Sequence, residues 1–323
     1  MHDLPSYREL PLRGGARCAW HVWEGREALG ALNLLTPERI IAATREVRRA
    51  CVFSLNLSLF IPDPPLFGRP PARHEVIRTS DTSQDDLLHS WNTQSSSQWD
   101  GFRHVHFPGQ GYFGGLPDAR HGVDHWARNG IVARGTLVDI GRWRTQAGRP
   151  LRYDAPDPIT ASDLVACLAA QRTAVEPGDI LLLRTGWLSW YLELNPAERA
   201  DLAAPSGLRN PGLAPSEDVA ELLWDMHVAA VAADNPALEV WPIGSMLSPQ
   251  EAEMVEQDRS LAYKALLHLR LVAMLGIVIG ELFDLEALAE DCMADGCYTC
   301  LLTSSPLNLP AGVASPPNVL AIK

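Results

Sequence analysis

The densest group of chemically useful side chains lies in the stretch 94–106, which reads QSSSQWDGFRHVH. Gln98 and Asp100 are two positions apart, so an extended backbone would point both side chains to the same side. Asp100 and His104 are four positions apart, so a turn of helix would place both on one face. A strand that ends at Asp100 and passes into a turn would bring all three together. Carboxylate and imidazole groups bind divalent metals and carry out acid–base catalysis, so the stretch predicts such a site, with a surface loop of chance polar residues as the alternative.

Two further ionisable residues stand in apolar surroundings near the C-terminal end. His268 lies within the sequence ALLHLRLV, and Glu281 follows IVIG. A charge among apolar residues is costly unless it has a partner. One unbroken helix would not place both residues on the same face. A break at Gly276, however, would let His268 project from a helix and Glu281 from the following strand into one pocket. The alternative is a hydrogen-bonded core histidine and a glutamate beyond the end of the strand.

The segments that must position these residues form an irregular mixture of helices and short strands. Capping residues and apolar periodicity predict helices at 36–50, 160–170, 216–226, 248–275 and 285–294. Apolar patterns predict strands at 54–61, 179–185, 228–232 and 276–280. Strands and helices do not alternate strictly, and no glycine-rich nucleotide fingerprint is present, which disfavours a doubly wound sheet or a helix-wrapped barrel. No flexible linker is evident, so the sequence predicts a single α/β domain over residues 1–323.

Composition and charge exclude several classes of function. The 323-residue chain has a formal net charge of −12, and a negative protein is attracted neither to nucleic acid nor to an anionic membrane surface. No apolar run reaches the roughly 18 residues needed to span a bilayer, and the first residues lack the basic and apolar segments of a signal peptide. We therefore expect a small-molecule substrate as the partner and the cytoplasm as the location.

In its two polar segments the chain resembles the cyclase family, which includes the kynurenine formamidase-like metal-dependent hydrolases. That family carries the motif HxGTHxDxPxH, followed later by a histidine and a glutamate. Asp100 stands at the motif aspartate and His104 at its last histidine, while His268 and Glu281 match the later pair. The QWDG sequence followed by Arg103 and His104 resembles a variant subgroup. The likeness extends over nearly the whole chain, through the stretches 29–38, 124–126, 130–139, 178–187, 233–236 and 315–318.

The resemblance implies a fold and a metal site. The family fold is a swivelling β/β/α domain, in which helices flank a mixed, barrel-like sheet, and its members are usually homo-oligomers, so we expect a homodimer or homotetramer. The family ligands of one metal correspond to Asp100, His268 and Glu281. Gln94 and Gln98 stand where two further metal-binding histidines are usual. An amide oxygen is a harder and weaker ligand than imidazole, so we expect one divalent ion, Mn²⁺ or Zn²⁺, with Gln98 as a fourth ligand.

The implied activity is hydrolysis of a small amide, cyclic imide or lactone, which breaks a carbon–nitrogen or ester bond. Asp100 would help to hold the metal that activates water, and His104 would act as the general base, as the last motif histidine does in the family. Four neighbouring residues are candidates for contacting the substrate: Gln94, Trp99, Arg103 and His125. A structural role, as a core side chain, a hydrogen-bond partner or an exposed ion pair, is the alternative for these neighbours.

Two other functions are compatible with the same residues. A cyclase or dehydratase of a secondary-metabolite pathway, which is a lyase, could use His104 and Asp100 without a metal and would be indifferent to chelators. A non-catalytic small-molecule binding protein would bind its ligand without turnover, and the two glutamines would then mark lost catalysis. The joint presence of Asp100, His104, His268 and Glu281 favours the hydrolase.

Overall fold

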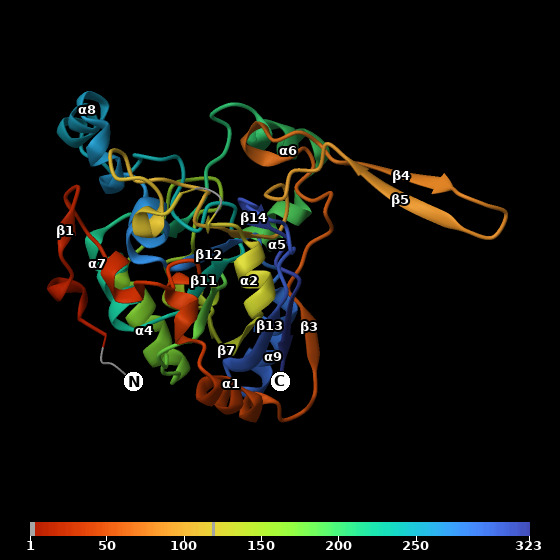
Figure 1. The fold of residues 1–323 in the computed structure, drawn as a ribbon, viewed down its shortest axis with the longest axis horizontal. Coiled ribbons are helices and arrows are strands. Elements are labelled where there is room, and N and C mark those ends of the chain that lie inside the picture. The colour runs from red at the N-terminus through yellow and green to blue at the C-terminus, as the bar shows by residue number, and fades with distance from the viewer. Residues whose placement is uncertain (1–3, 118–119) are drawn as a thin grey trace.

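A curled sheet of nine strands forms the centre of the computed structural model, which describes residues 4–117 and 120–323 (Figure 1). The strands follow the order β14-β6-β12-β11-β9-β7-β13-β15-β3. Their bounds are β3 Val52–Ser54, β6 Gln98–Asp100, β7 Ile131–Val138, β9 Ile180–Leu183, β11 Ala230–Ala233, β12 Val278–Glu281, β13 Thr299–Ser304, β14 Ala314–Ser315 and β15 Val319–Ile322. This half-barrel sheet and the helices around it confirm the predicted fold class, a mixed, barrel-like sheet flanked by helices.

Four neighbouring strands at the centre, β7, β9, β11 and β12, run parallel. Parallel strands are covered on both faces and therefore read as continuous apolar runs, and the sequences ILLL of β9 and AVAA of β11 are buried throughout. Antiparallel strands flank this centre, with β6 and β14 beyond β12, and β13, β15 and β3 beyond β7. The sheet thereby places the start of β6 beside the end of β12, although the two segments are far apart in the sequence.

Helices surround the sheet, and several of them were predicted. The helices expected at 160–170, 216–226 and 285–294 are confirmed as α4 (Ala161–Gln171), α7 (Glu217–Asp225) and α9 (Glu286–Asp295). α4 begins with a capping box in which the Thr160 hydroxyl accepts from the Asp163 backbone. The remaining α-helices and short strands are α1 Pro37–Ala43, α2 Asp124–Asn129, α3 Ile140–Gln146, α5 Trp187–Glu193, α6 Pro196–Ala203, α8 Pro249–Gln257, β1 Leu12–Arg13, β2 Ala16–Arg17, β8 Pro158–Ile159 and β10 Gly212–Leu213.

The single helix predicted at 248–275 is wrong. α8 ends where Asp258 adopts an extended backbone, and the Asp258 side chain accepts a hydrogen bond from the backbone N–H two residues later at 2.9 Å. Aspartate competes with helix formation in this way because its carboxylate bonds to nearby backbone N–H groups. A 3₁₀ helix (Arg259–Lys264) and a π-helix (Leu269–Leu275) follow.

The strand predicted at 54–61 and the helix predicted at 36–50 are wrong in extent. β3 pairs with β15 only over residues 52–54, and the Leu57 N–H then donates to the Ser97 hydroxyl at 2.8 Å, so the chain leaves the sheet edge. α1 ends at Ala43. A few residues later the backbone bonds to the end of β15 through the Lys323 carbonyl instead of continuing a helix.

A two-stranded hairpin projects from the body of the protein (Figure 1). Its strands, β4 (Arg73–Arg78) and β5 (Gln84–His89), pair antiparallel with each other, and apolar side chains such as Val76 and Leu88 are exposed on it. A pair of strands without a third strand or a covering helix is marginally stable in water. The hairpin joins two segments, 66–69 and 94–100, that both reach the site described below.

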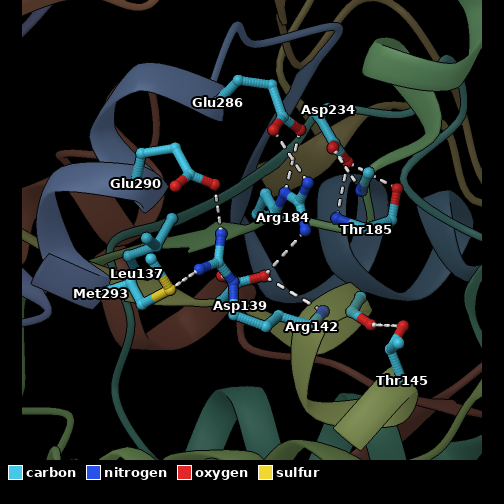
Figure 2. Close-up of polar contacts among 12 residues, drawn as sticks. Leu137, Asp139, Arg142, Thr145, Arg184, Thr185, Asp234, Glu286, Glu290 and Met293 are labelled. Carbon is cyan, nitrogen blue, oxygen red and sulfur yellow. Dashed lines mark hydrogen bonds and ion pairs between the residues drawn. The ribbon is translucent and has the colours of Figure 1, made fainter.

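A buried polar network holds the carboxyl ends of the central strands (Figure 2). The Arg184 guanidinium, just after β9, donates to Asp139 after β7 at 3.1 Å and to Glu286 of α9 at 2.8 and 2.9 Å. Asp234, just after β11, accepts from the backbone N–H groups of Thr185 and the next residue at 2.8 and 2.7 Å. Burial nevertheless raises the pKa of Asp234 to about 6. The network therefore fixes the ends of β7, β9 and β11, and β11 pairs with β12.

The helices of residues 4–117 and 120–323 are short relative to a bilayer-spanning segment. None of them is long and apolar enough to cross a membrane. The longest α-helix, α4, has 11 residues, whereas a spanning helix needs about 20.

Candidate active site

Two strands bring three polar side chains together. β6 and β12 pair antiparallel with Gln98 opposite Glu281, so these side chains share one face of the sheet. The Gln98 Nε2 donates to Glu281 Oε2 at 2.6 Å and lies 3.4 Å from Asp100 Oδ1. Gln98 and Asp100 point to the same side because they are two positions apart in a strand, as predicted. All three side chains are buried.

His268 reaches the same point from the segment just before the π-helix. Its Nε2 lies 3.3 Å from Glu281 Oε1 and 3.8 Å from Asp100 Oδ2. The chain reverses at Gly276, which ends the π-helix with a φ of 69°, and a Cβ there would lie only 2.4 Å from the Phe113 ring. The predicted break at Gly276 is therefore confirmed, and it lets His268 and Glu281 enter one site from consecutive elements.

Glu239 is a buried partner of His268 that the sequence reasoning missed. Its Oε1 lies 2.5 Å from His268 Nδ1, and its two oxygens also accept from the backbone N–H groups of Leu267 and His268. A carboxylate on Nδ1 fixes a histidine ring so that Nε2 is the atom offered to the site. Glu239 lies in the apolar sequence ALEVW, and the cost of burying an unpaired charge is the signal that could have identified it.

The crowding of carboxylates and imidazoles shifts the pKa values of the site. Burial disfavours the charge on His268, but the carboxylates of Glu239, Asp100 and Glu281 outweigh burial and raise its pKa well above the usual value. Burial would also raise the pKa of Asp100, but the positive charges of His104 and His268 lower it to about 2. Burial and the charge of Asp100 raise the pKa of Glu281 to about 7. The surroundings therefore shift the pKa values of the two carboxyl groups in opposite directions.

A pocket of 230 Å³ opens onto two of these side chains, His268 and Glu281. His104, His268 and Glu281 form its polar wall together with Arg69, and its apolar wall consists of Phe67, Val105, Pro236, Ala237, Trp241, Ile243 and Leu266. The Arg69 guanidinium lies 5.0 Å from the centre of the Phe67 ring. The Phe67 and Trp241 rings pack edge to face, with their centres 5.1 Å apart. Phe67 has a φ of 59°, a costly conformation for a side chain of this size. An apolar pocket with a few convergent polar groups is suited to a small molecule.

A larger cavity of 570 Å³ lies elsewhere and shares no lining residue with this pocket. Trp23, Arg39 and His227 are among its lining residues, and that lining includes no carboxylate. Ionisable groups with strongly shifted pKa values in a pocket are typical of functional sites, and the smaller pocket is lined by such groups. The smaller pocket is therefore the candidate active site.

Gln94 lies behind His104, which is part of the polar wall. The Gln94 Nε2 lies 2.8 Å from Asp100 Oδ1 and 2.9 Å from His104 Nδ1. Asp100 on its own would raise the pKa of His104, but burial and the positive charges of His268 and Arg69 outweigh it and lower that pKa. His104 is therefore neutral at neutral pH. The Gln94 amide contacts these site residues and does not line the pocket.

Three residues predicted to contact the substrate lie away from the pocket. Trp99 lies on the face of β6 opposite its neighbours because adjacent residues of a strand alternate, and its indole donates to the Ser304 hydroxyl at 2.9 Å. The Arg103 guanidinium donates to the Ala311 carbonyl. The His125 ring lies in α2, and Arg128 Nη2 approaches it at 3.4 Å. These contacts correspond to the structural roles that the sequence left open.

The donor atoms of the site fit a divalent cation. Two buried oxygens, Gln98 Oε1 and Asp100 Oδ2, have no hydrogen-bond partner in the described part of the chain, and a buried oxygen without a partner is costly. Asp100, His104 and His268 offer ligand atoms within 4.8 Å of one another, and Glu281 Oε1 adjoins His268 Nε2. Carboxylate and amide oxygens combined with an imidazole suit Mn²⁺ or Zn²⁺. Of the four predicted ligands, Asp100 and His268 belong to this group of three, and Gln98 and Glu281 adjoin them.

Comparisons with known proteins agree with the observed fold. The family model described as a cyclase matches residues 41–240. The crystal structure of a novel cyclase has a TM-score of 0.78 and 30% sequence identity, and the comparison covers 95% of this chain and 99% of that chain. No curated protein matches the chain.

Isatin hydrolases have the same fold at lower identity. For isatin hydrolase A from Labrenzia aggregata, bound to benzyl benzoate, the TM-score is 0.57 and the identity 17%, over 88% of this chain and 97% of that chain. For isatin hydrolase A from Ralstonia solanacearum, the TM-score is 0.60 and the identity 16%, over 89% of this chain and 98% of that chain. A shared fold does not fix a reaction, which depends on the site.

Proposed function

Because the chain belongs to the cyclase family, we propose that it is a hydrolase that opens a small amide, cyclic imide or lactone. The observation that carries the proposal is the convergence of Asp100, His104, His268 and Glu281 from two distant segments, beside a small pocket that the last three of them line. Buried ionisable groups with strongly shifted pKa values in a pocket are typical of catalytic sites. The fold shared with isatin hydrolases also supports hydrolysis.

We propose that Asp100, His268 and Glu281 hold one divalent ion, Mn²⁺ or Zn²⁺, and that Gln98 Oε1 is the fourth donor. The contact between Glu239 and His268 Nδ1 supports this assignment because it leaves Nε2 for the ion. A cation held there would polarise a substrate carbonyl and lower the pKa of a water molecule that it binds. Glu239 is a positioning residue, since it acts through His268.

Hydrolysis also needs side chains that orient the substrate and transfer protons. The water oxygen bonds to the carbonyl carbon, the bond from that carbon to nitrogen or oxygen breaks, and the leaving atom gains a proton. His104 is the neutral imidazole at the pocket wall, so one of its ring nitrogens carries a proton and the other a lone pair. The nitrogen that faces the substrate decides whether His104 accepts a proton from water or donates a hydrogen bond to the substrate oxygen.

The pocket supports a small substrate with an apolar body. The rings of Phe67 and Trp241 provide an aromatic wall, and the volume of 230 Å³ limits the size of the molecule. Arg69 places a positive charge at the same wall. A guanidinium binds carboxylates well, so Arg69 would attract the carboxylate that hydrolysis releases.

Turnover of a small panel tests the proposal. The purified protein would be incubated with an aryl formamide, a cyclic imide and an aromatic lactone, and the carboxylate product would be followed by mass spectrometry. We expect hydrolysis of at least one compound, loss of activity with a chelator, and recovery with Mn²⁺ or Zn²⁺. His268→Gln should abolish turnover, while His21→Gln, at an exposed histidine outside the site, should not.

Two other results would favour the alternative functions. Turnover that is indifferent to the chelator would support a metal-free lyase. Ligand binding without turnover across the whole panel would support a binding protein. Either result would contradict the proposed metal-dependent hydrolysis.

A further inference from the structure

Gln94 contacts both Asp100 and His104 through its side-chain amide. Its side-chain Nε2 lies 2.8 Å from Asp100 Oδ1 and 2.9 Å from His104 Nδ1. Its backbone is held as well, because its N–H donates to the Asn92 side chain at 2.8 Å and its carbonyl accepts from the Arg69 guanidinium. Gln94 is therefore fixed at both its backbone and its amide.

The orientation of the Gln94 amide follows from its contact with Asp100. A carboxylate oxygen accepts hydrogen bonds and cannot donate them. Asp100 Oδ1 receives Gln94 Nε2 at 2.8 Å and also faces the Gln98 amide nitrogen at 3.4 Å. A rotated Gln94 amide would place its own oxygen against this carboxylate oxygen, and two acceptors at that distance repel each other. The NH₂ group of Gln94 must therefore face Asp100.

The same NH₂ group faces His104, and this contact selects one form of its ring. An NH₂ group only donates, so His104 Nδ1 must offer a lone pair to it. A neutral imidazole carries a single proton, which must then lie on Nε2. The lone pair on Nδ1 also excludes the doubly protonated ring, so this contact by itself specifies the neutral form with its proton on Nε2.

We infer that Gln94 holds His104 in the form whose Nε2 carries the proton, so that His104 presents a hydrogen-bond donor, and not a base, to the pocket. This inference deepens the proposed function and rests on it for the identity of the acceptor, the substrate carbonyl oxygen. A fixed donor aimed at an oxygen that gains negative charge stabilises the transition state. A neutral histidine serves this purpose without the cost of burying another charge. Gln94 is then a positioning residue that acts through His104.

The form of the ring can be measured without any substrate. The full-length protein would be labelled with ¹⁵N and ¹³C in its 10 histidines, and the ring nitrogen and carbon shifts would be recorded at neutral to mildly basic pH. His104→Asn identifies the signals of His104 by their loss. We expect the Nε2–H pattern in the wild-type protein. A pattern with the proton on Nδ1 would overturn the inference, and because this readout needs no turnover, it is independent of whether the proposed function is correct.

Variants at position 94 separate the hydrogen bond from a general effect on folding. Gln94→Leu removes the donor while keeping a side chain of similar size, so the two neutral forms of His104 should become mixed. Gln146→Leu, at an exposed glutamine at the end of α3, is the matched control and should leave the His104 signals unchanged. Signals that stay purely Nε2–H in Gln94→Leu would contradict the role given to Gln94.

Substitution of His104 tests the donor role on a substrate that the enzyme turns over. His104→Gln supplies an amide N–H without a basic nitrogen, whereas His104→Ala supplies neither. Loss of a donor of this kind lowers kcat by roughly 100- to 1000-fold. We therefore expect His104→Ala to lose about that much, and His104→Gln to retain at least tenfold more activity than His104→Ala. Equal inactivity of the two variants would show that His104 acts as a base and would overturn the inference.

Discussion

Replacement of Glu239 by glutamine tests how strongly Glu239 holds His268 in the site. The carboxylate of Glu239 accepts three N–H groups, those of the Leu267 backbone, the His268 backbone and His268 Nδ1. Glutamine has the same shape but only one acceptor oxygen, and its NH₂ group must face one of these donors. At least one buried N–H group therefore loses its partner. The hydrogen bond from the His268 imidazole also loses its negatively charged acceptor.

The size of the effect follows from these lost contacts. An unpaired buried donor costs about 1–3 kcal/mol, and loss of a charge-assisted hydrogen bond adds about 1–2 kcal/mol, so Glu239→Gln should lower the free energy of unfolding by roughly 2–5 kcal/mol. Loss of a carboxylate that orients a ligating histidine typically lowers metal affinity by roughly 10- to 100-fold. We expect both effects in the same variant.

Two assays read these effects separately. Urea denaturation in the presence of a chelator measures the free energy of unfolding, and calorimetric titration of the metal-free protein with Mn²⁺ or Zn²⁺ measures affinity. Glu253→Gln, at an exposed glutamate of α8, is the control and should match the wild-type protein in both assays. A Glu239→Gln variant with wild-type stability and wild-type metal affinity would refute the role given to Glu239.

Two further predictions concern stability. Because burial raises the pKa of Asp234 from 3.8 to about 6, the folded state holds a proton in this pH window that the unfolded state has released. The free energy of unfolding should therefore fall by roughly 2–3 kcal/mol as the pH rises from about 4 to about 6, and Asp234→Asn should flatten this fall in urea titrations; an unchanged slope would contradict the assignment. Gly276→Ala should cost roughly 2–4 kcal/mol, because it adds a side chain in the left-handed conformation and presses it against the Phe113 ring. Gly296→Ala has the same φ of 69° but open space around it, so it should cost only about 1 kcal/mol, and equal losses in the two variants would argue against the clash.

Local periodicity made the Asp100 segment predictable. Residues two apart in a strand share a face, so the convergence of Gln98 and Asp100 could be expected, and the same rule places Trp99 on the other face, where the structure has it. The contact between Gln98 and Glu281 joins residues that are 183 positions apart. No local signal specifies such a pairing, and the sequence could suggest it only through the resemblance to a family.

The parts of the site that were missed lie on irregular backbone. Glu239 follows β11 in a loop, and Phe67 and Arg69 precede the projecting hairpin. Loop conformation depends on tertiary contacts more than on residue type, as the unusual φ of Phe67 illustrates. The cost of burying a charge would have identified Glu239, but the position of Arg69 at the pocket could not be inferred in the same way.

Metal content tests the central claim most directly. Protein purified without chelator would be measured by mass spectrometry beside Asp100→Asn and beside Asp234→Asn, which changes an equally buried aspartate outside the site. We expect about one Mn²⁺ or Zn²⁺ ion per chain in the wild-type protein and in Asp234→Asn, and loss of the ion in Asp100→Asn. Absence of metal from all three proteins, even after incubation with both ions, or retention of metal in Asp100→Asn, would contradict the proposed metal site.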